Sequence, residues 1–338
     1  MLLQLRYALF PAALVLFAIL GPFVLEPFDL VNLSAFSAMA IAALGLAFVW
    51  GTLGILNLGH SVFFGLGAYA YAMSVSNVGD STIAVLIGTV LPVVFSLVLG
   101  YFLFFSRLGE VYLGVITLCV TLIFYSFMTS TADPWFHIGP VPLGGFNGIT
   151  AVPSLNIPGE VQGFLSIEAT FSICLVSLAG IYILLSFLRM SDAGRIMTAI
   201  RESELRSELL GYDIRLYKLV GFAISAAIAG LGGALYTAVM GFVSPNVFDL
   251  SQASQFVLWV IAGGLGTFVG PVVASFGFQL LSSQLGANTV FNTELIFGAT
   301  IILFVLLAPQ GLLPMILKLS NLRFPNGFGR LRRKEKPA

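Results

Sequence analysis

The sequence predicts an all-α integral membrane protein of about ten transmembrane helices, with two broken segments that fold back in the membrane and both termini in the cytoplasm. Three observations lead to this prediction: the composition, the lengths of the apolar segments, and the distribution of Lys and Arg. Hydrophobic residues make up 58% of the 338 residues and charged residues 9%, and the mean hydropathy is +1.02. Because a soluble domain carries about 25% charged residues, this chain cannot cover a soluble surface.

Six apolar segments have the length of single membrane spans. They lie near 8–25, 82–105, 111–131, 166–188, 217–242 and 292–308. Two further segments, 34–76 and 253–285, would form helices of about 64 Å and about 50 Å, against a hydrocarbon core of about 30 Å. Each must therefore fold back on itself. The breaks are expected at Asn57–His60 and at Gly263–Pro271, where glycine and proline loosen a helix, and the total becomes ten spans.

The basic residues support this count independently. Ten spans from a cytoplasmic N-terminus leave four segments in the cytoplasm: the N-terminus, 106–110, 189–216 with the adjoining Lys218, and the tail from about 310. All fifteen Lys and Arg residues fall in these segments, as the positive-inside rule requires. The opposite side holds none, and its largest part is an external loop over 132–165. We therefore expect one transmembrane domain over 1–317 and a basic cytoplasmic tail over 318–338 beside the lipid bilayer.

Several absences limit the function. No lysine follows a glycine, so the phosphate-binding loop G-x-x-x-x-G-K-[ST] is missing. The predicted spans hold no Asp, Glu, Lys or Arg near their middle, where ion-coupled carriers place such residues as relays. No His, Cys or acidic residues have metal-ligand spacing, and no nucleophile is paired with a base. We expect no catalytic site, no metal, no cofactor bound by this chain and no nucleic-acid binding, which together favour a transport subunit that receives energy through a contact.

A third of all charged residues lie in one short stretch. Residues 192–218 carry ten of the thirty charged side chains. The stretch 192–211 lacks proline and is rich in helix-forming residues, but the apolar face around Ile200 is not continued by Leu205 and Leu209. The pattern predicts two short helices with a bend near Glu202–Ser203. They form either a solvated helical link between two spans or a docking element that enters a groove of a partner.

Four stretches resemble the permease subunits of branched-chain amino acid ABC importers, the Liv type. The loop and following span, "GRIMTAIRESELRSELLGYDIRLYKLVGFAISAAIAGLGGALYTAVMGFVSP", are similar to the cytoplasmic loop and next span of that family. "GILNLGHSVFFGLGAYAYA" resembles its early glycine-rich segment, and "GGLGTFVGPVV" and "LAPQGLLPM" resemble its C-terminal portion. The similarity covers most of 34–314. The general importer pattern E-A-A-x-x-x-G has glutamate six residues before Gly211, whereas this chain has Leu205 there and Glu204 one residue earlier.

The resemblance implies a permease subunit in a bacterial-type cytoplasmic (inner) membrane, on the path of a small neutral or zwitterionic solute such as a branched-chain or hydrophobic amino acid. It implies four partners: a second homologous permease, two ATPase subunits that bind ATP and Mg, and an extracytoplasmic solute-binding protein. The loop would couple to the ATPases through Arg195, Ile200, Arg201, Glu202, Glu204, Glu208 and Gly211. Permeases of urea or short-chain amide importers are closely similar and remain an alternative. An ion-coupled carrier and a purely structural membrane subunit are alternatives of other classes.

The two helix breaks are the candidate solute path, because broken helices in opposite halves of a transporter mark its binding site. Polar groups at a turn within the membrane need partners or a water-lined cavity. Close helix packing alone also explains glycines at such a break. The candidate pathway residues are Asn57, His60, Ser61, Gly65, Gly67, Gly263, Gly264 and Thr267. In the external loop, Gly144, Gly145, Asn147 and Gly148 either shape the mouth that faces the binding protein or form a plain turn.

Overall fold

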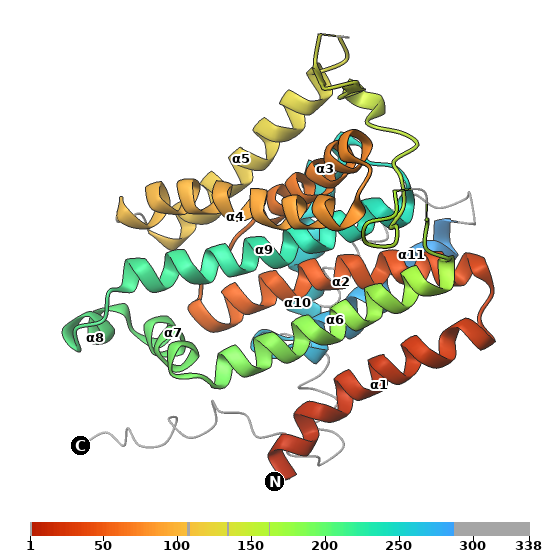
Figure 1. Cartoon of the computed structure of the whole chain (residues 1–338). Helices are drawn as coiled ribbons and strands as arrows, with labels where there is room; N and C mark the ends of the chain where they lie inside the picture. The colour runs from red at the N-terminus through yellow and green to blue at the C-terminus, as the bar shows by residue number, and fades with distance from the viewer. Residues whose placement is uncertain (1, 107–108, 134, 162, 287–338) are drawn as a thin grey trace, which may run out of the picture.

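The computed structural model describes residues 2–106, 109–133, 135–161 and 163–286 (Figure 1). The helices in this part are α1 (Leu2–Val24), α2 (Pro27–Leu53), α3 (His60–Val78), α4 (Ser81–Phe105), α5 (Glu110–Ser130), α6 (Ile167–Met190), α7 (Asp192–Glu202), α8 (Glu204–Leu209), α9 (Ile214–Met240), α10 (Leu250–Gly263) and α11 (Val269–Gly286). Short 3-10 helices, η1 (Gly145–Asn147) and η2 (Pro245–Phe248), and a two-stranded hairpin, β1 (His137–Ile138) with β2 (Val141–Pro142), complete it. The predicted span 292–308 and the basic tail lie outside the described residues.

The long helices have the properties of membrane spans. Within the described residues, α2, α4, α5, α6 and α9 are long and apolar enough to cross a bilayer, and Leu9–Val24 and α10 are shorter apolar helices. The outer faces of α4, α5 and α6 carry exposed large apolar side chains such as Phe102, Ile123 and Phe187. A lipid-facing surface consists of such residues. The chain is a mostly helical, multi-pass membrane protein.

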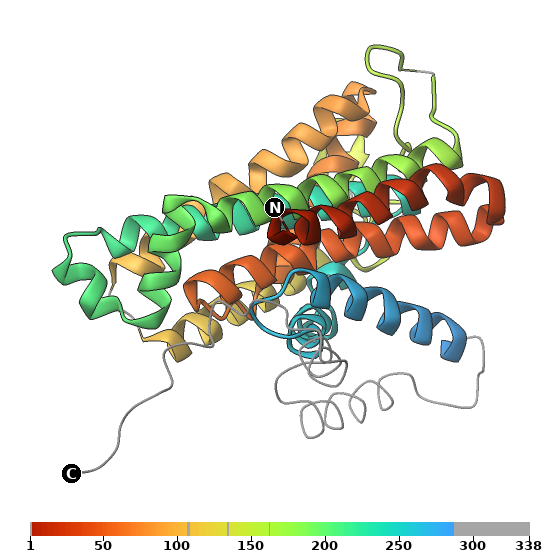
Figure 2. The ribbon, with the colours of Figure 1, turned by 90° about the horizontal axis from the view of Figure 1, so that it is seen from below.

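Helix α9 is at the centre of the bundle. It packs against α2, α3 and α4, while α6 lies against α2 with α1 beside it. In Figure 1 these helices run roughly along one direction. Helix α10 crosses them steeply and is seen end-on in Figure 2, and α11 leaves its far end to pack against α2. Helix α2 therefore contacts α6, α9, α10 and α11, whereas α1 packs on α6.

Glycines let the backbones of α3, α4 and α9 touch. A Cβ atom placed on Gly233 of α9 would lie 1.9 Å from the carbonyl oxygen of Phe64 in α3. One placed on Gly67 would lie 2.2 Å from the carbonyl oxygen of Gly230. Contacts this short exclude any side chain, which is how small residues bring membrane helices together.

Both predicted helix breaks are confirmed. Helix α2 ends at Leu53 and α3 begins at His60, and α10 ends at Gly263 while α11 begins at Val269. Gly54 ends α2 in the left-handed conformation (φ 78°), and its N–H donates to Trp50 O. The segment from Gly54 to Gly59 then returns into the bundle. His60, which follows it, contacts Ala42, and Ala42 lies about 16 Å back along α2 from the end of that helix, at 1.5 Å per residue.

The segment 132–165, which the sequence predicts to be an external loop, is an ordered cap rather than a span. Ile149 pairs with Val243 beyond the end of α9, and Asn156 pairs with Phe164 within the loop. Gly144, Gly145 and Gly148 adopt positive φ, and Gly145 packs against the backbone of Ala132. Asn156 also accepts from and donates to the start of α4 at Gly79–Ser81. The four residues 144, 145, 147 and 148 therefore shape a tight, partly buried turn on the bundle.

Replacing Gly233 with alanine should destabilise the fold, because the new methyl group would collide with Phe64 O and the helices would have to separate. We expect a loss of about 1–3 kcal/mol in the free energy of unfolding. Gly180→Ala is the matched control, since nothing lies within 4 Å of a Cβ there, and alanine is favoured over glycine in a helix by about 0.5–1 kcal/mol. Thermal unfolding of the two variants in detergent compares them, and equal midpoints would contradict the packing described.

Candidate functional site

The first helix break forms a closed polar junction. His60 and Asn57 are fully buried. Nε2 of His60 lies 2.9 Å from Ala42 O, and because a carbonyl only accepts, this nitrogen carries the proton. Asn57 Oδ1 accepts from Gly59 N at 3.1 Å, which turns the amide nitrogen of Asn57 toward Nδ1 of His60 at 3.5 Å. The imidazole is therefore a neutral bridge between the end of the break and the middle of α2.

The same junction is tied to α5. Gly59 N also donates to Thr117 Oγ1 at 3.3 Å, and a Cβ on Gly59 would lie 2.0 Å from Thr117 O. Ser61 is buried, and its hydroxyl has no partner among the described residues. Gly65 faces the ring of Phe248, and Gly67 faces Gly230. The candidates at this break therefore meet as a packed junction, and the two glycines serve helix contact.

The second helix break is a tight glycine turn. Gly264 and Gly266 have φ of 102° and 89°, which non-glycine residues rarely adopt. Thr267 Oγ1 donates to Gly264 O at 2.9 Å and so closes the turn. Gly263 and Gly270 bring the backbones of α10 and α11 together, since a Cβ on Gly270 would lie 1.9 Å from Gly263 O. Gly263, Gly264 and Thr267 thus build the hairpin turn.

The second turn lies against the end of α2, close to where the first break begins. A Cβ on Gly51 would lie 3.2 Å from Gly266 N. Arg189, at the end of α6, donates from Nη1 to Gly266 O and lies over the ring of Phe268 at 5.6 Å. The turn between α10 and α11 is therefore held from two sides, by α2 and by the last turn of α6.

Arg201 links the charged loop to the same place. It lies in the last turn of α7, and its Nη1 donates to Gly51 O, one of the terminal carbonyls of α2 that the helix itself leaves without a partner. Its side chain also packs against Gly54, where a Cβ would lie 3.1 Å away. We call Arg189, Arg201, Gly51 and Gly266 the arginine node. The node connects both helix breaks to the loop.

The loop has the two short helices that the sequence predicts. Helix α7 ends at Glu202, and Ser203 adopts an extended conformation and caps α8 by accepting from Arg206 N. The inner face of α7 is buried through Gly194, Met197 and Ile200. Ile200 is only 1% exposed, so this candidate coupling residue supports α7 from behind and cannot touch a partner directly.

Helix α8 turns apolar side chains outward. Leu205, Leu209 and Leu210 are 68%, 79% and 74% exposed. Leu205 and Leu209 stand four residues apart and share one helix face. Together with Leu210 they form an exposed patch, the α8 leucine patch, on an otherwise charged loop. Gly211 (φ 89°) lets the chain reverse into α9 directly after it.

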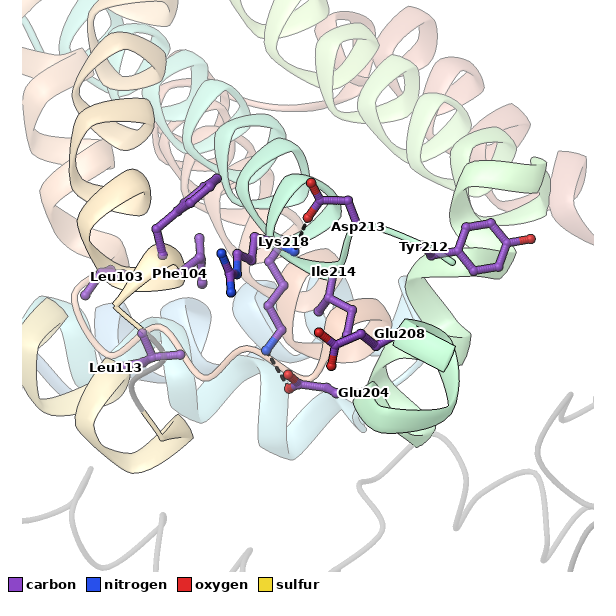
Figure 3. A pocket seen from close by; sticks show the side chains of 11 residues that line it. Leu103, Phe104, Leu113, Glu204, Glu208, Tyr212, Asp213, Ile214 and Lys218 are labelled. Atoms are coloured by element: carbon purple, nitrogen blue, oxygen red, sulfur yellow. Dashed lines mark hydrogen bonds and ion pairs between the residues drawn. The ribbon is translucent and has the colours of Figure 1, made fainter. Parts of the chain in front are cut away.

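A cavity of about 480 Å³ lies between α8, the start of α9 and the ends of α4 and α5 (Figure 3). Lys218 extends from α9 across this cavity to Glu204 of α8, and the two form an ion pair. Asp213 caps α9 by accepting from Arg215 N and Leu216 N. Glu208 lines the cavity and has no ion pair with a described residue. The Glu204–Lys218 pair therefore fastens α8 to the start of α9.

The charged loop residues that the sequence assigns to the ATPase contact have different roles in the structure. Arg201 and Glu204 are engaged within the chain, which differs from the expectation that they are offered to a partner. Arg195 pairs with Asp192 at 3.2 Å on the exposed side of α7, while Glu202 and Glu208 are exposed. The sequence interpretation missed Arg189, Gly51 and the α8 leucine patch. The four-residue spacing of Leu205 and Leu209 was a signal for the patch, whereas bonds to backbone carbonyls have no sequence signature.

Comparison with known proteins adds a family relationship. The family model described as "Branched-chain amino acid transport system / permease component" matches residues 30–306. The branched-chain amino acid permease LivM of Escherichia coli K12 is 30% identical over 94% of this chain and 78% of its own length. A probable LivM of Methanocaldococcus jannaschii is 24% identical over 77% and 80%, and LivH of E. coli K12 is 24% identical over 82% and 91%. No solved structure matches the chain.

Breaking the Glu204–Lys218 pair should loosen α8 without unfolding the bundle. Glu204→Gln removes the charge, and partly exposed pairs of this kind contribute about 1 kcal/mol or less. We expect amide hydrogen exchange over residues 203–210 to speed up by up to about fivefold, the equivalent of that energy. Asp192→Asn is the control, because it breaks the exposed Arg195 pair and leaves α8 attached. Unchanged exchange in Glu204→Gln would show that the pair does not hold α8.

Proposed function

Because the chain belongs to the branched-chain amino acid transport system permease family, which its match over residues 30–306 shows, we propose that it is the membrane-spanning subunit of an ATP-binding-cassette importer for branched-chain amino acids. The observation that supports this assignment most strongly is the family match over residues 30–306. A charged loop whose outer helix exposes a leucine patch agrees with it. An importer permease needs such a cytoplasmic contact, since it receives its energy from separate subunits.

The membrane arrangement that we propose has ten spans, with both termini in the cytoplasm of a bacterial-type cell and the chain in its inner membrane. The distribution of all fifteen Lys and Arg residues supports it. Residues 1–317 then form one permease domain, 189–216 the cytoplasmic coupling loop and 132–165 the external loop. Residues 318–338 form a basic tail at the lipid surface.

The partners in this proposal are a second homologous permease, two ATPase subunits and an extracytoplasmic binding protein. Relatives named LivM and LivH support a paired arrangement of two similar permeases. ATP and Mg bind to the ATPases, so this chain has no catalytic role and carries no cofactor. The α8 leucine patch enters a groove of an ATPase, as amphipathic helices do in partner grooves, and Glu202 and Glu208 contact its rim.

Movement of α8 would reach the membrane through the arginine node. Arg201 connects α7 to the end of α2, and the close approach of Gly51 to Gly266 continues the link to the α10–α11 turn. When the ATPases close on ATP, the loop is displaced and both helix breaks shift with it. The solute path opens to the other side of the membrane by this displacement.

A neutral or zwitterionic solute suits the interior of the bundle. Among the described residues, Lys218 is the one buried Lys, Arg, Asp or Glu side chain, and it is paired with Glu204 at the loop. Ion-coupled carriers place charged residues within the spans. The relatives are named for branched-chain amino acids, and no feature of the site favours urea or an amide. The amino acid is therefore the preferred cargo.

Replacing Leu205 and Leu209 with aspartate should remove coupling. In the assembled importer, reconstituted with its ATPases, second permease and binding protein, we expect stimulation of ATP hydrolysis by the loaded binding protein to fall at least about tenfold, since two buried apolar contacts contribute more than about 1.4 kcal/mol. Leucine uptake should fall in parallel.

The matched control is Leu205→Met with Leu209→Met, which keeps an apolar patch of similar volume and should retain both activities. Co-purification of the two permeases confirms insertion and pairing of each variant. Full stimulation in the aspartate variant would refute the docking role of α8. ATP-independent uptake by this chain alone would refute the importer assignment.

A further inference from the structure

A second cavity, of about 240 Å³, lies between α2, α10 and α11, and none of its described lining residues belongs to a helix break or to the loop. Its lining is Asn32, Phe36, Met39, Gln255, Trp259, Phe278, Gln279, Ser282 and Ser283. We propose that this cavity is the seat of the solute in the permease, and that it binds a zwitterionic amino acid with an aliphatic side chain. The inference rests on the proposed function and names the site at which that function occurs.

Three helix faces converge on the cavity. Asn32, Phe36 and Met39 follow one another at four- and three-residue steps along one face of α2, and Gln255 and Trp259 stand four residues apart on α10. The cavity lies beside the half of α2 that is remote from the loop. Met39, which lines it, is about 21 Å from Leu53 at the loop end of α2, at 1.5 Å per residue. In the proposed topology this is the external half, where the binding protein delivers its cargo.

Several polar groups in the cavity have no partner within the described part of the chain. Trp259 is 1% exposed, and its indole N–H has no acceptor there. Gln279 donates to Ser275 O at 3.1 Å, whereas Asn32, Gln255 and the two serines make no hydrogen bond to described residues. A buried N–H without an acceptor is rare and costly in a native protein. The indole N–H, the amide N–H groups and the hydroxyl groups can donate to a carboxylate. The amide oxygens can accept from an ammonium group.

The remaining lining fits an aliphatic side chain. Phe36, Met39 and Phe278 are apolar, and among the described residues that line the cavity none is Asp, Glu, Lys, Arg or His. An ion with net charge would therefore be buried without compensation. Cavities for drug-sized ligands measure about 300–1,000 Å³, so this smaller one suits a small metabolite. Urea, which is polar throughout, would leave the apolar residues without a partner.

The cavity is connected to the loop through the α10–α11 hairpin. Two of its three walls are α10 and α11, and the turn between them is held by Arg189 and abuts Gly51. Displacement of the arginine node changes the position of both helices against α2. The cavity would then change shape when the ATPases close, which is what release of a solute requires.

The test uses the assembled importer in proteoliposomes with labelled L-leucine. Trp259→Phe combined with Asn32→Leu removes the indole N–H and the amide group, and leaves an aromatic and an aliphatic side chain in their places. We expect leucine uptake per ATP hydrolysed to fall about tenfold, with hydrolysis stimulated by the binding protein unchanged. Ser254→Ala is the control, because Ser254 is exposed on α10 and, within the described residues, bonds only Ser251 O, and it should match the wild type.

A labelling experiment gives a second measurement that does not depend on transport. Ser282→Cys is introduced in a Cys119→Ala background, since Cys119 is exposed and Cys174 is buried. Leucine should slow its reaction with a methanethiosulfonate reagent severalfold, and urea should not. Equal uptake per ATP in the Trp259→Phe, Asn32→Leu variant, or equal protection by urea, would overturn the cavity assignment alone. A wild-type importer that takes up no leucine would overturn the proposed function, and the cavity assignment with it.

Discussion

Backbone carbonyls at the two helix breaks need hydrogen-bond donors, and two arginines at the ends of α6 and α7 provide them. Arg201 donates to Gly51 O and Arg189 to Gly266 O. A helix that stops within or near a bilayer exposes polar backbone groups that lipid cannot satisfy. The charged segment lies close enough to satisfy one carbonyl at each break, and this contributes to ending both helices there. The same bonds make the loop and the breaks one mechanical unit.

The remainder of the bundle fits around this unit. Helices α3 and α9 are in backbone contact at Gly67, Gly230 and Gly233. The core around α9 therefore has little freedom to deform. His60 ties the first break to the middle of α2 in its neutral form. The α10–α11 hairpin lies outside this tight core and contacts α2. It is thus the element best placed to move when the loop moves, and it carries two walls of the solute cavity.

Much of the fold followed from length and spacing in the sequence. Segments too long for one crossing located both breaks, and the loss of a continuous apolar face after Ile200 located the bend at Ser203. The family resemblance was also confirmed by the match over residues 30–306. The ten-span count and the orientation still rest on the basic residues, since the last expected span lies outside the described part.

The sites were harder to predict, for physical reasons. An arginine bonded to a backbone carbonyl looks the same in sequence as one that faces a partner, so the role of Arg201 was not visible. Glu204 and Lys218 are fourteen residues apart and meet only because Gly211 reverses the chain. Ile200 was placed at the partner contact because a helical face was visible but its burial was not. The cavity needs side chains from three distant helices, and no local pattern brings Asn32, Trp259 and Ser282 together.

In the proposed mechanism, the arginine node transmits displacement of the loop to the α10–α11 hairpin. Spin labels at Arg206 on α8 and at Leu280 on α11, each paired with a reference label at Tyr101 on α4, would report the two movements in the assembled importer with and without trapped ATP. We expect both distances to change in the wild type, and we expect Arg201→Met to preserve the α8 change and abolish the α11 change. An α11 change in Arg201→Met equal to that of the wild type would contradict it.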